Sequence, residues 1–349
     1  MERGAGVKSG GDIRRQDATI TLALAGDVML GRLVNQVLAT EGPRYPWGDV
    51  LPLLRGADLT LVNLECAIAT GGTPWRRTPK VFHFRTGPLG LAALQEAGVD
   101  FVSLANNHVL DFEVEAMVET LARLDGAGIA RAGAGRDLAE AARPALLAAG
   151  GLRVGVLAFT DNEPVWAAGA ATPGINYLPV TLDERHFRRL REGVAAARAA
   201  GADLVVLENH WGPNMRLRPM SGFREFARAA VEAGVDVYVG HSAHVLQGIE
   251  MHRGRPIFYD LGDFVDDYAV DPELRNDLSA LALVTFSRRG VEAIEMVPVA
   301  IDFCQVNLAV GREYEEIAGR LIDLSAELGT TIVRRDGRLV VAGQRQAAA

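Results

Sequence analysis

The sequence is poor in cysteine, in aromatic residues and in positive charge, and each shortage excludes a class of protein. Two cysteines in 349 residues cannot form a disulfide framework, so they are expected to be small buried thiols. Aromatic residues make up 6% of the chain and hydrophobic residues 49%, which predicts a large and mainly aliphatic core. A formal net charge of -8 argues against a protein that wraps a nucleic-acid backbone.

Long hydrophobic runs are also missing from the sequence. No stretch approaches the roughly 18 apolar residues that a membrane-spanning helix needs. The first 17 residues contain glycine and charge but no apolar signal segment, so they are expected to be a flexible leader, and residues 344–349 a frayed tail. We therefore expect a cytoplasmic protein with no membrane and no nucleic-acid partner, and homo-oligomer formation stays open.

Short continuous apolar runs alternate with amphipathic stretches over the first two thirds of the chain. Runs such as 20–25 and 204–207 are typical of strands buried on both faces of a sheet. Helices are expected between them, and Gly98 and Gly234 provide helix stop signals. After residue 240 the pattern favours three β-hairpins, with a helix before the last, at 245–261, 281–301, 313–328 and 331–342. A parallel start and an antiparallel finish predict an α/β protein with two stacked mixed sheets flanked by helices.

Polar residues with metal-ligand chemistry follow five of the expected strands. In order of the strands they are Asp27, then Asn63 and Glu65, then Asn106, Asn107 and His108, then His210, and finally His241 and His244. Each alone has an ordinary explanation as a helix cap, a turn residue or a structural histidine. Ligands, however, gather at the carboxyl ends of strands in α/β sheets. Carboxylate, carboxamide and imidazole together suit Mn, Fe or Zn, and two such ions can activate water.

Several strings resemble, in order, the motifs of the CapA/PgsA poly-γ-glutamate capsule synthesis family. They are AGDVMLGR at 25–32, NLE at 63–65, SLANNH at 103–108 with Asp111, HWG at 210–212, the segment 240–248, and YDLGDF at 259–264. The resemblance covers about residues 18–302. That family is similar to calcineurin-like metallophosphoesterases, so the resemblance implies a four-layer α/β/β/α sandwich of metallophosphoesterase type with a dinuclear site.

The resemblance also implies roles for individual residues. Two divalent metal ions, Mn, Fe or Zn, are expected to be bound by Asp27, Glu65, Asn107, His210, His241 and His244, with Glu65 as the bridging carboxylate. His108 is the expected general acid, and it forms the catalytic set with Asp27 and Asn107. The candidate substrate contacts are Asn63, Asn106, Arg77, His83, Trp211 and Asp263. Open alternatives are a solvated loop for Arg77, a strand position for His83 and simple packing for Trp211.

Three positions depart from the family pattern. Ser242 and Ala243 stand where a His-Pro pair is common, Asn214 stands where an acidic residue is frequent, and Asp260 and Asp263 replace a serine and an asparagine. As in the capsule family, Met29 stands where classical phosphoesterases have the histidine of an Asp-x-His opening. The two added aspartates affect the expected substrate more than the expected metal binding.

The domain and function expectations follow from these residues together. Residues 18–345 are expected to form one metallophosphoesterase-like catalytic domain, whose part from about residue 303 is a helix and hairpin extension. The expected function is hydrolysis of a phosphoester, or of a γ-glutamyl or peptide-like amide, by metal-activated hydroxide on a small or peptide-like anionic substrate. The alternative is a non-catalytic protein that binds an anionic polymer or a synthase partner in poly-γ-glutamate-type biosynthesis.

Overall fold

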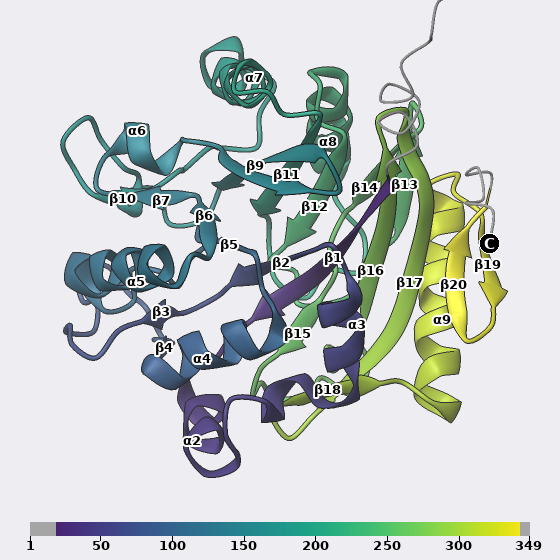
Figure 1. The fold of residues 1–349 in the computed structure, drawn as a ribbon, viewed down its shortest axis with the longest axis horizontal. Coiled ribbons are helices and arrows are strands. Elements are labelled where there is room, and N and C mark those ends of the chain that lie inside the picture. Colours follow the sequence, from purple (N-terminus) through teal and green to yellow (C-terminus); the bar gives the residue numbers. More distant parts are fainter. Residues whose placement is uncertain (1–18, 343–349) are drawn as a thin grey trace, which may run out of the picture.

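Two mixed β-sheets and eight α-helices make up residues 19–342, the part of the chain that the computed structural model describes (Figure 1). The predicted fold class, an α/β protein with two mixed sheets flanked by helices, is confirmed. The expected leader at 1–17 and the expected tail at 344–349 lie outside the described residues. Within 19–342, no helix combines the length and the apolar character needed to cross a membrane.

The larger sheet has ten strands, and β1 (Thr19–Val28) lies near its middle. β1 pairs in parallel with β2 (Leu59–Leu64) and antiparallel with β16 (Leu278–Ser287). The remaining strands are β5 (Phe101–Ser103) and β6 (Ala130–Ala132) beyond β2, β17 (Gly290–Asp302), β20 (Arg338–Val341) and β19 (Ile332–Arg335) beyond β16, with β15 (Asp263–Val265) on β1 and β18 (Gln305–Leu308) on β17.

The second sheet has six strands, four of which run parallel. In spatial order the strands are β13 (Ile249–His252), β14 (Arg255–Phe258), β12 (Val237–His241), β11 (Leu204–His210), β9 (Leu152–Thr160) and β8 (Ala145–Ala149). Two short ribbons complete the β structure, β3 (Ala67–Ile68) with β4 (Arg85–Thr86), and β7 (Ala134–Gly135) with β10 (Gly174–Ile175).

The core residues place these elements in four layers. Along β1, Leu22 and Leu24 pack against residues of the second sheet such as Val206, whereas Ala23 and Ala25 pack toward helices, as the alternation of a strand requires. The helices that cover the larger sheet are α2 (Arg32–Glu41), α3 (Leu51–Gly56), α4 (Pro88–Ala97) and α5 (Glu113–Ala127), and those on the second sheet are α7 (Glu184–Ala199) and α8 (Ser221–Glu232). The order is therefore α/β/β/α.

The remaining helical segments lie outside this main stacking. α9 (Gly311–Glu327) contacts β13, β16 and β17, so it closes one side of the core between the sheets (Figure 1). The short segments are α6 (Leu138–Ala141) and the 3-10 turns η1 (Tyr45–Val50) and η2 (Pro164–Trp166). The three expected hairpins are confirmed as β13–β14, β16–β17 and β19–β20. Both cysteines are free and buried, as expected.

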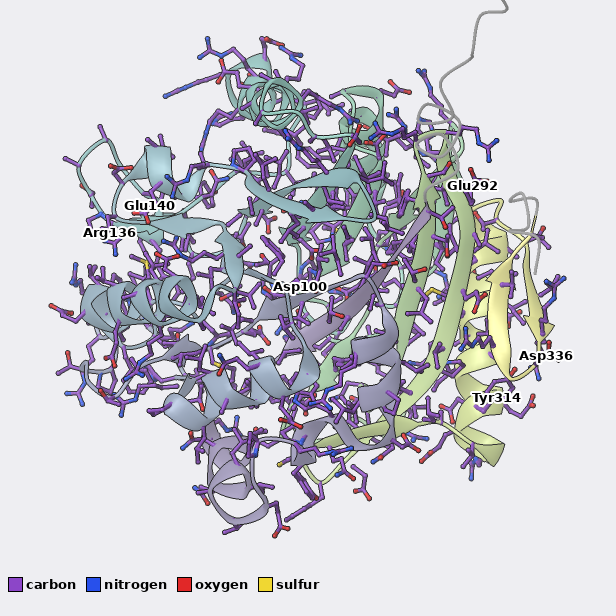
Figure 2. The ribbon with its side chains drawn as sticks, viewed as in Figure 1. Asp100, Arg136, Glu140, Glu292, Tyr314 and Asp336 are labelled. Atoms are coloured by element: carbon purple, nitrogen blue, oxygen red, sulfur yellow. The ribbon has the colours of Figure 1, made fainter. Side chains whose placement is uncertain are left out.

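An aspartate stands just before four of the parallel strands and ties each to its neighbour. Asp100, before β5, donates its backbone N–H to Thr60 O at 3.0 Å, and its carboxylate accepts the Thr60 N–H at 2.8 Å. Asp58, Asp203 and Asp236 make the same two bonds to Thr21, Arg153 and Val205. Figure 2 shows Asp100 near the centre of the view, among the strands. The paired bonds fix the register of neighbouring strands where the strands begin.

Removing one of these carboxylates should weaken the fold. In Asp100→Ala the N–H of Thr60, a fully buried residue, loses its partner, so we expect a loss of about 1–3 kcal/mol in the free energy of unfolding. Asp100→Asn keeps an acceptor oxygen of the same shape and should lose much less. Urea unfolding monitored by circular dichroism measures both. Equal stability of the alanine variant and the wild type would contradict a structural role for these aspartates.

Candidate metal centre

The carboxyl ends of strands from both sheets meet at one place. β1 pairs with β15 and β2 so that Asp27 lies beside Asp263 on one side and Asn63 on the other. In the second sheet, His210 at the end of β11 lies beside His241 at the end of β12. All five side chains are buried. The strand ends that the sequence singled out therefore lie together, and two sheets contribute to a single site.

Glycine permits the close backbone approach that brings β15 to β1. Asp27 N–H donates to Gly262 O at 3.0 Å. A Cβ atom at Gly26 would lie 1.9 Å from that same oxygen, so no larger residue fits there without movement of the backbone. The sequence Gly26-Asp27 is thus explained by geometry, because the glycine admits β15 and the aspartate then faces into the site.

Four acidic or histidine residues form a group that could hold a metal ion. Asp27, Glu65, His244 and Asp263 each offer one ligand atom, and these atoms all lie within 4.8 Å of one another. His244 Nδ1 lies 3.5 Å from Asp27 Oδ2 and 2.7 Å from Asp263 Oδ1. Three of the four are ligands expected from the sequence, whereas Asp263 was expected to contact the substrate.

The other three expected ligands lie around this group. His241 Nδ1 is 3.2 Å from Asp27 Oδ1, and His210 Nε2 is 3.8 Å from Glu65 Oε1. Asn107 follows β5, lines the same pocket as His244 and has a buried carboxamide oxygen with no hydrogen-bond partner. The structure therefore brings five of the six expected ligands together and places Asn107 in the pocket that His244 lines, and their binding of metal stays a prediction.

Unpartnered polar atoms provide a test of whether a metal fits. Five buried atoms of this set make no hydrogen bond, namely Glu65 Oε1, Asn107 Oδ1, His210 Nε2, His241 Nδ1 and Asp263 Oδ2. Buried polar atoms without partners are rare, because each costs on the order of 1–3 kcal/mol. All five are oxygen or imidazole nitrogen atoms, which are the donors that Mn, Fe and Zn accept. The donor set therefore fits a divalent metal ion.

The electrostatics of the group point the same way. Burial, together with the nearby charge of Asp27, raises the pKa of Glu65 to about 8, and burial raises the pKa of Asp263 well above its ordinary value. Burial would also raise the pKa of Asp27, but the close imidazoles of His241 and His210 hold it below the usual range. Several carboxylates thus lie close together in a buried part of the structure, and a cation there would stabilise their ionised forms.

Neighbouring polar side chains contact the expected ligands and orient them. Glu208 lies 2.5 Å from His241 Nε2, so the other ring nitrogen, Nδ1, is left facing Asp27. Asn63 donates to Asp27 Oδ1 at 2.7 Å and lies 3.1 Å from His210 Nδ1. Asn106 in turn donates to Asn63 Oδ1 at 3.1 Å. Asn63 and Asn106 therefore lie inside the site, and their predicted contact with substrate stays a prediction.

Two supporting residues were missed in the sequence. Glu208 lies in the same strand-end string as His210, and its alternate position along β11 could have indicated that it faces the same side of the sheet. Tyr268 donates its hydroxyl to Glu65 Oε2 at 3.1 Å from a segment with no signal of its own.

His108 is held beside the group by a separate set of contacts. Its Nδ1 lies 2.6 Å from Asp111 Oδ2, which also accepts the backbone N–H of Phe84 at 2.6 Å. The Phe84 ring stacks on the imidazole at a centroid distance of 4.0 Å. Nε2 is thereby left on the side of Glu65 Oε1, at 3.9 Å. Burial and the charge of Lys80 lower the pKa of His108 well below its ordinary value.

A cleft of about 800 Å³ opens onto these residues. Its lining includes Asn107, His108 and His244, and the rest comes from segments 79–82, 214–215 and 268–272 together with Arg32, Phe84, Glu163 and Asn276. The cleft thus reaches two of the expected ligands, Asn107 and His244.

The other three expected substrate contacts do not line this cleft. Arg77 forms an ion pair with Glu113, and His83 Nε2 lies 3.0 Å from Trp75 O in a loop rather than in a strand. Trp211 is 4% exposed and packs between aromatic rings that include Tyr238, at a centroid distance of 4.9 Å. Their contact with substrate stays a prediction, and the open alternatives of a surface loop and simple packing agree with these positions.

A family model and two sequence relatives agree on one family. The model of the bacterial capsule synthesis protein PGA_cap matches residues 21–268. A probable polyglutamine synthesis accessory protein of Mycobacterium tuberculosis is 32% identical, covering 92% of this chain and 95% of that protein. The PGA biosynthesis protein CapA of Bacillus subtilis is 31% identical, covering 82% of this chain and 72% of that protein. The solved structure of TT1561 of Thermus thermophilus aligns with a TM-score of 0.39 and 12% identity over 78% of this chain and 100% of that chain.

Replacing Glu65 by its neutral isostere should separate fold stability from metal binding. Because the folded pKa of about 8 lies above the ordinary 4.5, the metal-free protein should lose stability through this group as pH rises from about 4.5 to 8. In EDTA at pH 7.5 we expect Glu65→Gln to unfold at a higher temperature than the wild type, with the difference shrinking at pH 5. Added Mn should stabilise the wild type more than the variant. Thermal melts measure both effects, with Glu184→Gln on the surface of α7 as the control; a variant that is less stable in EDTA and equally stabilised by Mn would contradict this.

Proposed function

The chain belongs to the PGA_cap family of bacterial capsule synthesis proteins, and from that premise we propose that it is a metal-dependent hydrolase acting on a phosphoester or on a γ-glutamyl or peptide-like amide. One observation carries the proposal. Buried ligand atoms without hydrogen-bond partners gather at the strand ends, and a cleft opens beside them. A binding module would have no need to bury so many unpaired carboxylate and imidazole atoms.

We assign two divalent ions of Mn, Fe or Zn to this centre. The residues that would hold them are Asp27, Glu65, Asn107, His210, His241 and His244, with Asp263 as a further carboxylate. Met29 stands in place of the classical histidine, and its sulfur accepts the Gly31 N–H at 3.0 Å instead of facing the group. No histidine is present at position 29, and Asp263 on β15 offers a further carboxylate beside Asp27. When bound, such ions polarise the scissile bond and lower the pKa of water.

His108 is the residue that we assign to proton transfer. Asp111 holds Nδ1, so the imidazole cannot rotate freely and presents Nε2 to the space beside Glu65. The protonated imidazole is a strong acid because its pKa is low, and from its Nε2 a proton passes to the oxygen or nitrogen of the leaving group as the scissile bond breaks. The stacked ring of Phe84 excludes water from one face of the imidazole. Asn107 precedes His108 in the chain, which places the proton donor next to an expected ligand.

The names of the relatives support a substrate made of linked glutamate or glutamine units. The Mycobacterium tuberculosis protein is named for polyglutamine synthesis, and the Bacillus subtilis protein for PGA biosynthesis. We therefore propose that this chain acts in poly-γ-glutamate-type synthesis, and an amide of glutamate is the first substrate to test. The word accessory in one name favours the second candidate, a protein that binds an anionic polymer or a synthase partner without catalysis.

Metal content should depend on residues from both sheets. We expect the purified wild type to contain about two equivalents of Mn, Fe or Zn by elemental mass spectrometry. Asp27→Ala on β1 and His241→Ala on β12 should each lose most of that metal. His186→Ala is the control, because His186 lies on α7 and pairs with Asp183. Folded wild-type protein that takes up no added metal would remove the basis of the hydrolase proposal.

Activity should depend on His108 more than metal content does. We expect His108→Ala to keep its metal and to lose roughly 10²–10⁴-fold in kcat, because a general acid contributes about that much. The loss should be larger for a phenyl ester than for a p-nitrophenyl ester, since the better leaving group needs less protonation. Assays would use γ-glutamyl anilides and aryl phosphates. Wild type and variant that share an absence of turnover but bind polyglutamate equally would favour the accessory role.

A further inference from the structure

Arg32 ends the AGDVMLGR string and lines the cleft, but it has no place in the metal centre. Its guanidinium carbon lies 5.6 Å from the ring of Phe82 and 5.6 Å from the ring of Phe84. The Phe84 ring in turn stacks on His108. Since 39% of the Arg32 side chain is exposed, the cation is accessible from the cleft. The guanidinium of Arg32 thus lies near the same Phe84 ring that stacks on His108, the residue assigned to proton transfer.

The position of Arg32 is fixed by neighbours on one edge only. Asp267, whose side chain is 3% exposed, lies 3.3 Å from Arg32 Nε and accepts the Leu33 N–H at 2.8 Å. Within residues 19–342, the two terminal nitrogens of the guanidinium make no hydrogen bond. They form the edge that binds carboxylates and phosphates through two parallel bonds. Asp267 therefore holds the guanidinium of Arg32 in place, while the edge that carries its two terminal nitrogens stays without a hydrogen-bond partner.

The backbone at Arg32 is strained. Its φ of 49° lies in the left-handed region, which residues with a side chain rarely adopt. Such conformations persist where surrounding contacts impose them, and they cluster at ligand-binding positions. The strain gives no function by itself, but it shows that α2 begins with an arginine where a glycine would be easier to accommodate.

The other charged residues of the cleft are committed or acidic. Lys80 has a side chain that is 6% exposed, and its ammonium group donates to Asn107 O at 2.6 Å and lies 3.3 Å from Asp111. The acidic residues of the cleft wall are Glu163 and Asp271. Among the described cleft residues, Arg32 is therefore the one cation with an unpaired edge, and two carboxylates line the same cleft, which suits a ligand with a single anionic group better than a continuous polyanion.

We propose that Arg32 binds one anionic group of the substrate, a carboxylate or a phosphate, and so sets the position of the scissile bond relative to His108. The proposal rests on the proposed hydrolase function for its substrate, but anion binding by Arg32 is measurable without turnover. Asp267 and the aromatic rings of Phe82 and Phe84 restrict the movement of the guanidinium, so less conformational freedom is lost when an anion pairs with it. A substrate held in this way is a small molecule or the end of a chain.

The test is calorimetric titration of the Mn-loaded protein with two probes. Glutarate represents a carboxylate, and phenylphosphonate represents a phosphate. We expect Arg32→Gln to weaken binding of one probe by about 10- to 100-fold, and Arg32→Lys, which keeps the charge without the two-bond geometry, to fall between. Arg191→Gln is the matched control, because Arg191 also lies over a ring, Phe187 at 5.8 Å, and pairs with Glu184 on the distant α7. It should bind both probes as the wild type does.

The outcomes separate this proposal from the hydrolase proposal. If the wild type binds a probe and Arg32→Gln weakens it, the anion site stands even when no substrate is turned over. Where turnover is seen, the variant should raise KM about as much and also lower kcat, because the scissile bond is then positioned less well relative to His108. Binding that is equal in wild type, Arg32→Gln and Arg32→Lys, or no binding of either probe to the wild type, would overturn the assignment. Should Arg32→Gln not fold by circular dichroism, the lysine variant carries the comparison.

Discussion

The burial of several carboxylates and imidazoles at one point between two sheets is the constraint on which the rest of the structure depends. Asp27, Glu65 and Asp263 are each almost completely buried, and they lie close enough to repel one another when ionised. Such a group destabilises a folded chain unless a cation balances it. The aliphatic core between the sheets and the strands around the group must therefore hold this arrangement against repulsion, and most of its members accordingly lie in strands or just after them.

Several residues of the site are supported by a partner side chain. Glu208 orients His241 from the next strand, Asn63 lies between Asp27 and His210, and Asp111 orients His108. These contacts join the two sheets through polar bonds at the same place where their apolar faces end. Geometry and electrostatics are thus coupled, because a change in one supporting residue alters both the direction and the charge of a ligand.

The sequence predicted the placement of the strand-end residues well and that of residues from irregular segments poorly, and the role of either set as ligands stays a prediction. Asp27, Asn107 and His210 follow apolar runs, and their placement depends on a rule that all α/β sheets obey. Asp263 lies on a three-residue strand that pairs with β1 far away in the sequence, and no local pattern indicates such a pairing. Arg32 and Tyr268 reach the cleft through turns whose direction is set by tertiary contacts. Arg77 was favoured by its charge alone, and charge does not determine where a loop lies.

The aspartates that precede the parallel strands have a consequence for how this family can vary. Asp58, Asp100, Asp203 and Asp236 fix where neighbouring strands start. The number of residues between each aspartate and the expected ligand that follows it therefore determines where that ligand lies. The connecting helices can therefore lengthen or shorten between relatives without displacing the centre. A single inserted residue between one of these aspartates and the ligand that follows it would turn that ligand to the opposite face of the sheet. Insertions and deletions among working relatives should accordingly avoid these short spans and accumulate in the helical connections.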